Sequence, residues 1–378
     1  MEKFSSITTI YMGRDALASA LTEASRVFVV TDPFMVSSGK IEYVTNYLEE
    51  NDIQYTIFSD VESDPDIETV AAGMARILEF RPDHVVVMGG GSPIDAAKAV
   101  VYFARRQGGL GDCPFIAIPT TSGTGSEVSS FAVITDHRKN VKYPLVDESL
   151  LPDAAVLNAE LVMSVPPRVT ADAGLDVLTH SIEAFVSTQR TDFTDAMAEK
   201  AIRLIYRYLL TVYREPENYE ARRRVHNASC MAGIAFSNAG LGLNHAMAHT
   251  LGAKFHIAHG RANAMLLPYV MSFNAGCATT LTAAAARYAK IARLCDISTS
   301  SVRQSALNVI RTIRSWDRKM GVPSSIKEAG VSEGDFYAYL GEMTEDAYAD
   351  SCLSTNPRPC DKAEIRQVFI NAYNGKLP

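Results

Sequence analysis

Residues 84–93 read His-Val-Val-Val-Met-Gly-Gly-Gly-Ser-Pro, and they carry the clearest structural signal in the first part of the chain. A short, uninterrupted apolar run is typical of a strand that is buried on both faces. Three glycines follow, and Pro93 is a favoured first residue of a helix, which we predict over residues 93–105. The order strand, glycine loop, helix builds parallel sheets that bind ligands at the carboxyl ends of their strands.

The sequence on both sides repeats this unit. We predict that residues 7–11 form an edge strand or one arm of a hairpin. The further strands and helices alternate; the strands are 27–30, 55–58 and 115–119, and the helices are 41–50 and 67–80. This alternation predicts a Rossmann-like α/β domain with a parallel sheet over residues 1–166.

The pattern changes near Pro166 and Pro167, where strand signals stop. Long helical patterns follow, and we predict an all-helical second domain over residues 167–378, with helices at 170–188, 193–213, 219–238, 262–269, 279–295, 302–320 and 363–373. A chain of 378 residues is long enough for two domains.

Composition excludes several classes of protein. The net charge is −7 and no run of Lys or Arg occurs, which argues against a nucleic-acid partner. No apolar, uncharged stretch reaches the ~20 residues of a membrane-spanning helix. The N-terminus lacks the apolar run of a signal peptide, and the six cysteines are scattered without a C-x-x-C pair. We therefore expect reduced thiols and a cytoplasmic protein.

Two glycine loops are the first candidates for chemistry. The Gly89-Gly-Gly-Ser92 loop lets the backbone approach an anion, and the following helix offers free N–H groups and a positive dipole end. Taken alone, a plain tight turn and a diphosphate site explain this loop equally well. The second loop, Thr120-Thr-Ser-Gly-Thr-Gly-Ser126, adds hydroxyl donors at another strand end and favours phosphate binding. The spacing is not that of the G-x-G-x-x-G fingerprint.

Asp32 ends the first long strand. A carboxylate there can accept hydrogen bonds from a ribose diol and repel a 2′-phosphate, which favours NAD over NADP. Without the glycine loops, a turn or helix N-cap is the better interpretation of Asp32.

Histidines are concentrated in residues 240–260, which hold four of the eight in the chain. Asp176 and His180 lie four residues apart in a predicted helix, so both side chains share one face, and His245 and His249 repeat this spacing. Alone, such a pair is more often a surface or capping interaction. Three neutral imidazoles with one carboxylate suit a divalent transition metal such as Fe²⁺ or Zn²⁺, and after a dinucleotide-like domain they indicate a hydride-transfer site.

Four motifs carry a family resemblance over nearly the whole chain: residues 89–98, 119–128, 176–184 and 240–260. They resemble the iron-containing (group III) alcohol dehydrogenases, whose fold is that of dehydroquinate synthase. Within this family the sequence is most similar to the 1-propanol dehydrogenase branch of propanediol utilisation.

The resemblance implies roles for the histidines. It makes His249 a residue beside the nicotinamide and a candidate proton relay, and it leaves His256 outside the ligand pattern, as a structural residue on a loop. The implied metal ligands are Asp176, His180, His245 and His259.

The resemblance also implies the cofactor and substrate residues. Gly90, Gly91 and Ser92 hold the diphosphate; Thr120, Thr121 and Thr124 lie along the cofactor; Lys142 lies near its ribose; and Asp32 occupies the NAD-selecting position. The residues implied to line the substrate pocket are Phe131, Phe236 and Cys360. An apolar ring at position 131 indicates a small substrate without a second hydroxyl, although ordinary core packing is the alternative for both phenylalanines.

The implied function is metal-dependent, NAD(H)-linked interconversion of short-chain primary alcohols and aldehydes, with propionaldehyde reduced to 1-propanol to regenerate NAD. The implied metal is Fe²⁺, with Zn²⁺ as the alternative, and the implied assembly is a homodimer or larger homo-oligomer, in the cytoplasm or inside a bacterial microcompartment. The alternatives are a polyol dehydrogenase acting on glycerol or 1,2-propanediol, and a non-catalytic scaffold or filament subunit. A dehydroquinate synthase would carry a phosphate-binding Lys/Arg cluster, which the sequence lacks.

Overall fold

The computed structural model describes residues 3–138 and 141–377, with the side chains of residues 141 and 142 left out. Contacts divide the chain into two compact units. One comprises residues 5–164, and the other comprises residues 165–377 together with residues 3 and 4. The boundary between folding domains predicted at residues 166 and 167 stays a prediction.

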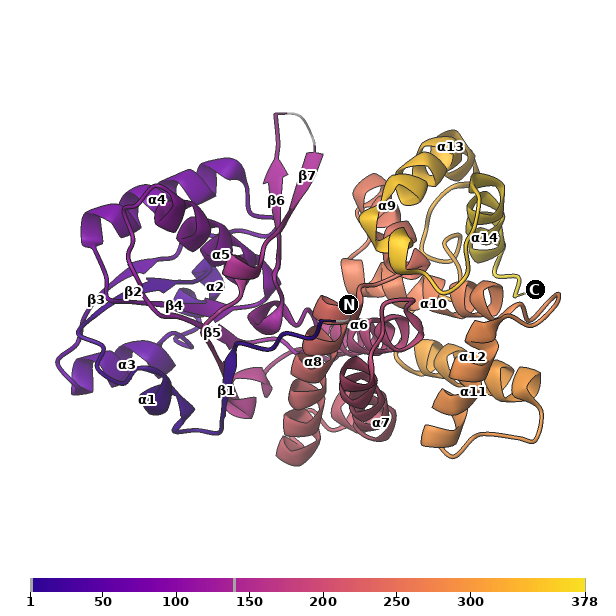
Figure 1. Cartoon of the computed structure of the whole chain (residues 1–378), viewed down its shortest axis with the longest axis horizontal. Coiled ribbons are helices and arrows are strands. Elements are labelled where there is room, and N and C mark those ends of the chain that lie inside the picture. The colour runs from indigo at the N-terminus through magenta and orange to yellow at the C-terminus, as the bar shows by residue number, and fades with distance from the viewer. Residues whose placement is uncertain (1–2, 139–140, 378) are drawn as a thin grey trace. The chain divides into compact units, whose positions relative to one another are not determined.

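The first unit contains a six-stranded, fully parallel sheet (Figure 1). Its strand order is β1-β8-β5-β4-β2-β3, with β1 at Thr9–Met12, β2 at Arg26–Val30, β3 at Gln54–Phe58, β4 at His84–Gly89, β5 at Phe115–Pro119 and β8 at Ala154–Leu157. The strand predicted at residues 7–11 is the edge strand β1, which decides between the two arrangements expected for it. The predicted α/β class with a parallel sheet is therefore confirmed.

Helices cover both faces of this sheet, which explains the continuous apolar sequence of the central strands. Val85 and Val87 of β4 point into a core formed with α4 (Ile67–Phe80) and α5 (Gly91–Arg106). Val86 and Met88 point into the opposite core, formed with α1 (Ala16–Ala20) and α3 (Glu42–Glu50). Because successive side chains of a strand alternate between faces, a strand buried on both sides needs apolar residues throughout.

Several elements of this unit were not predicted, and β8 and α1 are among them. The antiparallel hairpin of β6 (Phe131–Asp136) and β7 (Val141–Val146) follows the second glycine loop. The short helix α2 (Pro33–Ser37) follows β2 and has Asp32 as its N-cap.

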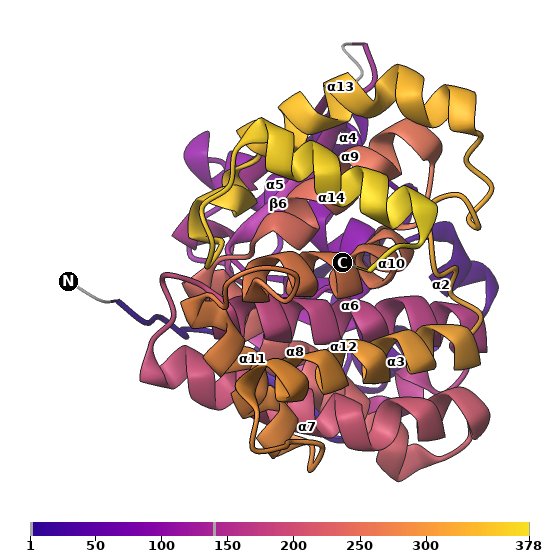
Figure 2. The same cartoon turned by 90° about the vertical axis from the view of Figure 1, so that its right-hand side faces the viewer.

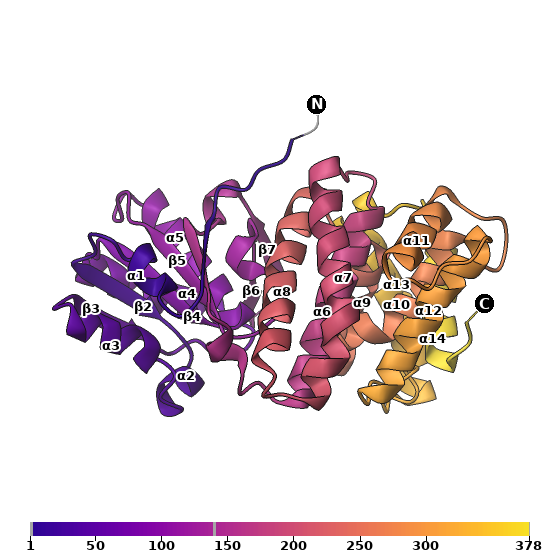
Figure 3. The same cartoon turned by 90° about the horizontal axis from the view of Figure 1, so that it is seen from below.

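The second unit consists of helices, and its described residues contain no strand. The helices are α6 (Pro167–Val186), α7 (Asp192–Arg214), α8 (Tyr219–Ala239), α9 (Leu243–Phe255), α10 (His259–Ala275), α11 (Ala283–Leu294), α12 (Val302–Lys319), α13 (Glu333–Ala349) and α14 (Lys362–Asn374). Helices α6, α7 and α8 lie side by side in Figure 3, and α11 to α14 lie at the front in Figure 2. The predicted all-helical class of this part is confirmed.

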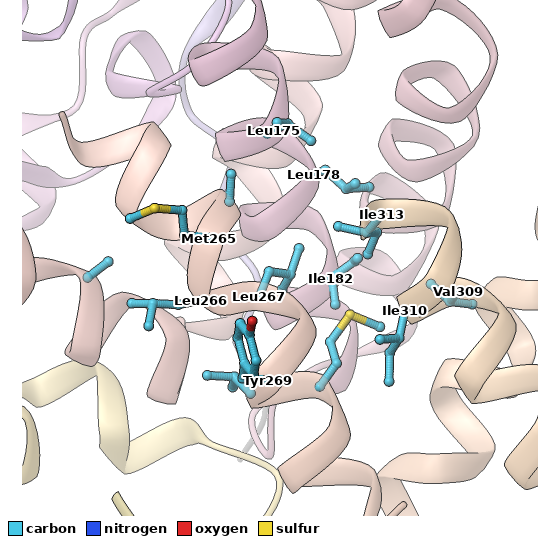
Figure 4. Packing of buried hydrophobic residues seen from close by; sticks show 14 of the residues in the cluster. Leu175, Leu178, Ile182, Met265, Leu266, Leu267, Tyr269, Val309, Ile310 and Ile313 are labelled. Carbon is cyan, nitrogen blue, oxygen red and sulfur yellow. The ribbon is translucent and has the colours of Figure 1, made fainter. Parts of the chain in front are cut away.

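The core of this unit positions the helices that carry the histidines. Leu175 and Leu178 of α6, Met265 and Leu266 of α10, and Ile313 of α12 pack into one buried cluster (Figure 4). Such burial stabilises the fold by about 25 cal/mol per Å² of apolar surface removed from water. Helices α6 and α10 thus pack directly against each other.

Helix boundaries differ from the predictions at two informative places. Helix α10 begins at His259, earlier than the predicted residue 262, so His259 is its first residue rather than part of the preceding loop. Helix α13 was missed, because Gly334 and Gly341 weaken its helical pattern.

Candidate metal and cofactor sites

The two glycine loops of the α/β unit meet at the carboxyl ends of neighbouring strands. Gly89 of β4 lies opposite Pro119 of β5, and the Thr120 N–H donates to the Gly89 carbonyl at 2.9 Å. Gly90 is the N-cap of α5, which begins at Gly91 rather than at Pro93. The N–H groups of the first turn of a helix have no partner within that helix, and they favour an anion there.

Close packing explains why position 91 in the first loop is a glycine. A Cβ atom on Gly91 would lie 2.9 Å from Cγ2 of Thr124, which is closer than packed carbon atoms approach. A Cβ on Gly90 would lie 3.6 Å from Thr121, at ordinary contact distance. The structure therefore brings Gly90, Gly91, Thr121 and Thr124 together at one strand edge, beside Ser92 in the first turn of α5.

Asp32 lies at the same edge, because β2 is the neighbour of β4. Its Oδ1 accepts a hydrogen bond from the Met35 N–H at 2.9 Å and caps α2. Its Oδ2 lies 3.3 Å from the position that a Cβ on Gly89 would take. Asp32 is thus both an N-cap and a carboxylate facing the glycine loop. Lys142 lies in β7, and its side chain falls outside the described residues.

A buried charged cluster underlies the second loop, and sequence reasoning assigned it no role. Lys98 is 1% exposed, and its Nζ donates to the carbonyls of Ser129 at 2.7 Å and Phe131 at 2.8 Å. Burial lowers the pKa of Lys98 to about 8 and raises the pKa of Glu127 to about 7. Asp95 accepts hydrogen bonds from the Ser126 hydroxyl and the Val133 N–H. These groups tie the loop and the start of β6 to α5.

The helical unit contains the predicted carboxylate and imidazoles in one place. Asp176, His180, His245 and His259 each offer a ligand atom, and these atoms all lie within 4.8 Å of one another. They come from three helices: α6 carries the first two, α9 the third and α10 the fourth. Three of the residues are buried, whereas the His259 side chain is 44% exposed, so the cluster opens on that side.

Hydrogen bonding shows that this cluster fits a cation. The Asn263 amide nitrogen lies 2.8 Å from Asp176 Oδ1 and 3.1 Å from Nε2 of both His245 and His259. A donor that faces all three atoms marks the point where their lone pairs converge. Burial and the neighbouring imidazoles also lower the pKa of His245 well below its ordinary value, which favours the neutral ring that binds metals.

Glu183 is a functional candidate that sequence reasoning missed. Its buried carboxylate accepts from Nδ1 of His245 at 2.5 Å and from the Asn244 N–H at 2.7 Å. A carboxylate on Nδ1 of a histidine fixes the tautomer in which Nε2 is the ligand atom. Burial raises the pKa of Glu183 to about 8, although the hydrogen bonds that it accepts from backbone N–H groups at the start of α9 act to lower it. The available signal was its spacing, since it follows His180 by three residues on the same helix face.

His249 lies beside the cluster and outside it. Its ring centroid is 5.5 Å from that of His259, and its Nδ1 donates to Asp350 Oδ2 at 2.8 Å. Burial would raise the pKa of the Asp350 carboxyl, but the hydrogen bonds from His249 and the Cys352 N–H lower it. Asp350 and Cys352 are 101 and 103 residues away from His249, so no local pattern pointed to them.

The implied pocket residues are placed differently from one another. Phe236 of α8 stacks on His180, with ring centroids 4.5 Å apart, so it forms an apolar wall of the cluster. Phe131 belongs to the other unit and begins β6. Cys360 is half-buried and precedes α14, and the described contacts do not connect it with the four-residue cluster. The cysteine that lies near His249 is Cys352.

His256 lies outside the cluster of metal-ligand candidates. It caps the end of α9 in a left-handed conformation, with φ of 52°.

No helix within the described residues is both long and apolar enough to cross a membrane.

Comparison with known proteins gives matches along the whole chain. The family model "Iron-containing alcohol dehydrogenase" matches residues 8–159, and "Fe-containing alcohol dehydrogenase family, C-terminal" matches residues 170–373. The chain is 43% identical to the 1-propanol dehydrogenase PduQ of Salmonella typhimurium over 373 residues, which covers 98% of this chain and 99% of that protein. It is 39% identical to the NADPH-dependent butanol dehydrogenase of Clostridium saccharobutylicum over 391 residues, with 99% of both chains covered. Among solved structures, a 1,3-propanediol oxidoreductase superposes with a TM-score of 0.91 at 32% identity, covering 99% of this chain and 100% of that one.

Proposed function

The chain belongs to the iron-containing alcohol dehydrogenase family, and we propose that it interconverts short-chain primary alcohols and aldehydes with NAD(H) as the hydride carrier. Propionaldehyde and 1-propanol are the proposed preferred pair, because a relative similar over the whole chain is a 1-propanol dehydrogenase. The observation that carries the proposal is the convergence of one carboxylate and three imidazoles, Asp176, His180, His245 and His259, within 4.8 Å.

Each part of this site has a chemical task. A divalent iron held by these four residues supplies Lewis acidity towards the alcohol or carbonyl oxygen, and NAD(H) supplies the hydride chemistry. Glu183 orients the His245 ring so that Nε2 faces the cluster. Phe236, whose ring stacks on His180, shields one side of the four-residue cluster from water.

His249 is the proposed proton carrier. Asp350 accepts from its Nδ1–H, which leaves Nε2 as the atom that takes up or returns the proton. The Asp350 carboxylate also stabilises the ring when it is charged, since an opposite charge within hydrogen-bond distance favours the protonated imidazole. Acid–base catalysis of this kind contributes about 10²–10⁴-fold to rate.

The cofactor belongs to the α/β unit in this proposal. Gly90, Gly91 and the first turn of α5 would hold the diphosphate, with the threonines of the second loop alongside. Asp32 would accept from the ribose diol through Oδ2 and exclude a 2′-phosphate. The NADPH-dependent butanol relative makes this choice of cofactor a useful test.

The nucleotide test compares NADH with NADPH in the wild type and in Asp32→Ser. Serine keeps an oxygen that can cap α2 and removes the charge, so stability should change little. The wild type should prefer NADH, and the variant should gain NADPH use. Equal use of both cofactors by the wild type would contradict the role of Asp32.

A diol substrate is the second candidate, because a 1,3-propanediol oxidoreductase has a closely similar structure. A panel of propionaldehyde, butyraldehyde, 3-hydroxypropionaldehyde and lactaldehyde separates the two. We expect the highest kcat/KM for the unsubstituted aldehydes, since Phe236 presents an apolar ring at the cluster.

The central test is NADH oxidation by protein prepared without oxygen and reloaded with Fe²⁺ or Zn²⁺ after chelation. Activity that returns with the metal supports the proposal and identifies the metal that works. Full activity in the stripped protein, with metal content confirmed as negligible, would refute the role of the metal. No activity with any metal and aldehyde would favour the scaffold interpretation.

We also propose a homodimer or larger homo-oligomer in the cytoplasm or inside a microcompartment, on the basis of the resemblance alone. Light scattering of the purified protein measures the assembly, and a fluorescent fusion in the native host measures the location. A monomer at working concentration would contradict the first part.

A further inference from the structure

A second group of metal-ligating side chains lies beside the proposed active site. His249, Asp350 and Cys352 each offer one ligand atom, and these atoms all lie within 4.8 Å of one another. None of the three belongs to the four-residue cluster of Asp176. The proposed reaction uses His249 and Asp350 for proton transfer and gives Cys352 no role.

The local structure aims the three groups at one point. Asp350 ends α13 and caps the short 3₁₀ helix η4 (Ser351–Thr355), where its Oδ1 accepts from the Cys352 N–H at 2.8 Å. Its Oδ2 accepts from Nδ1 of His249, which reaches it from α9. The turn therefore places a carboxylate and a thiol on the side that His249 faces.

The group is also accessible. The His249 side chain is 38% exposed and the Asp350 side chain 18% exposed. Cys352 is half-buried, whereas Cys113, Cys230, Cys277 and Cys295 are buried. An ion from solvent can therefore reach this group, in contrast to the buried thiols.

The donor set selects the kind of ion. A thiolate sulfur with an imidazole nitrogen and a carboxylate oxygen suits Zn²⁺ and the still more thiophilic Cd²⁺, whereas Mg²⁺ and Ca²⁺ prefer oxygen ligands alone. In a tetrahedral zinc site with bonds of about 2.0–2.3 Å, neighbouring ligand atoms lie roughly 3.3–3.8 Å apart. All the ligand atoms already lie within 4.8 Å of one another. His249 Nδ1 and Asp350 Oδ2 are 2.8 Å apart as hydrogen-bond partners and would separate by about 0.5 Å around an ion, a change that an exposed histidine side chain can accommodate.

We propose that His249, Asp350 and Cys352 form a second binding site for a thiophilic divalent cation such as Zn²⁺, and that its occupation inhibits the enzyme. The ion takes the Cys352 sulfur as thiolate, whose proton goes to solvent, and binds Nδ1 of His249, whose proton moves to Nε2, while water completes the coordination. Inhibition follows because a protonated Nε2 has no lone pair with which to take up a proton from the reaction. This last step rests on the proposed function, whereas the binding site itself does not.

Binding is tested without any activity measurement. Cd²⁺ is titrated into iron-loaded protein under anaerobic conditions while the ultraviolet charge-transfer absorption of a cadmium–thiolate bond is recorded. The four-residue cluster contains no cysteine, so exchange of its iron for Cd²⁺ gives no such band. The wild type should show the band, and Cys352→Ser should lose it.

Cys360→Ser is the matched control, since Cys360 is the other half-buried cysteine. It should keep the band at the wild-type cadmium concentration. Asp350→Asn should weaken cadmium binding, because removal of even an outer partner of a metal site costs about 10–100-fold in affinity and a direct ligand at least as much. Absence of the band in the wild type, or its survival in Cys352→Ser, would overturn the site.

Inhibition is tested by titrating Zn²⁺ into the iron-loaded enzyme during aldehyde reduction, with each variant normalised to its own activity without zinc. Iron content is measured after each assay, which separates inhibition at the second site from replacement of the catalytic iron. Cys352→Ser should need roughly tenfold more Zn²⁺ or above for half-inhibition. Equal inhibition of variant and wild type, with iron retained, would overturn the inhibitory role. A protein that shows the cadmium band and lacks all dehydrogenase activity would refute the proposed function and leave the cation site standing.

Discussion

Replacing Glu183 with glutamine should weaken metal binding without unfolding the protein. Glutamine has nearly the same size and shape, so the packing around this buried position is kept. Its amide oxygen can still accept from the Asn244 N–H at the start of α9. Its NH₂ group then faces Nδ1 of His245, which also donates a hydrogen in the tautomer that binds a metal.

Two donors facing each other force the His245 ring to change. The ring either rotates or shifts its proton from Nδ1 to Nε2, and a protonated Nε2 cannot bind the metal. Loss of such an outer hydrogen-bond partner typically costs about 10–100-fold in metal affinity, or roughly 1.4–2.7 kcal/mol. The effect should appear in the binding constant, whereas kcat at saturating metal should fall less.

The assay is competition for Fe²⁺ between the protein and a chelator of known affinity under anaerobic conditions, read by metal analysis of the separated protein. Glu127→Gln is the matched control, because Glu127 is also a buried glutamate with a raised pKa and lies in the other unit. It should keep the wild-type affinity for Fe²⁺. If Glu183→Gln, shown to be folded by circular dichroism, also binds Fe²⁺ like the wild type, the orienting role of Glu183 is refuted.

Three further changes test other parts of the structure. His249→Ala should keep the iron content and reduce kcat by about 10²-fold, and a loss of iron would contradict its place outside the metal ligands. Gly91→Ala should raise KM for NADH and spare the iron, because its Cβ would meet Thr124 Cγ2 at 2.9 Å, and an unchanged KM would contradict the role of this loop. His226 is buried, which lowers its pKa to about 4, so folded protein resists its protonation while unfolded chain accepts it near pH 6.5. Stability should therefore be lost as pH falls from 6.5 to 4, by about 3 kcal/mol from this residue, and melting curves of His226→Gln should show a shallower loss than the wild type over this window.

Local sequence patterns predicted most of the fold because they follow from local physics. The apolar run of β4 and its glycine loop were recognisable, since a strand covered on both faces requires apolar residues and a helix start requires a cap. The missed helix α13 and the β6–β7 hairpin carry weak local signals, and packing against the rest of the protein decides their structure.

The candidate site also contains residues that local sequence patterns predicted and residues that they did not. Asp176 and His180 lie one helical turn apart, so their shared face follows from the period of the helix alone, and the concentration of histidines in residues 240–260 is visible in the chain itself. The resemblance, rather than spacing, selected His245 and His259 as the other ligands.

Sequence patterns alone predicted which residues would bind a metal and a diphosphate, and most of the helices and strands that carry them. The residues that support them became visible in the three-dimensional packing. Glu183 reaches His245 across 62 residues and Asp350 reaches His249 across 101, while Cys352 joins that pair from the same turn. These contacts depend on how α6, α9 and the segment after α13 pack together. Packing of this kind is set by the burial of apolar surface across the whole helical unit, which no spacing along the chain encodes.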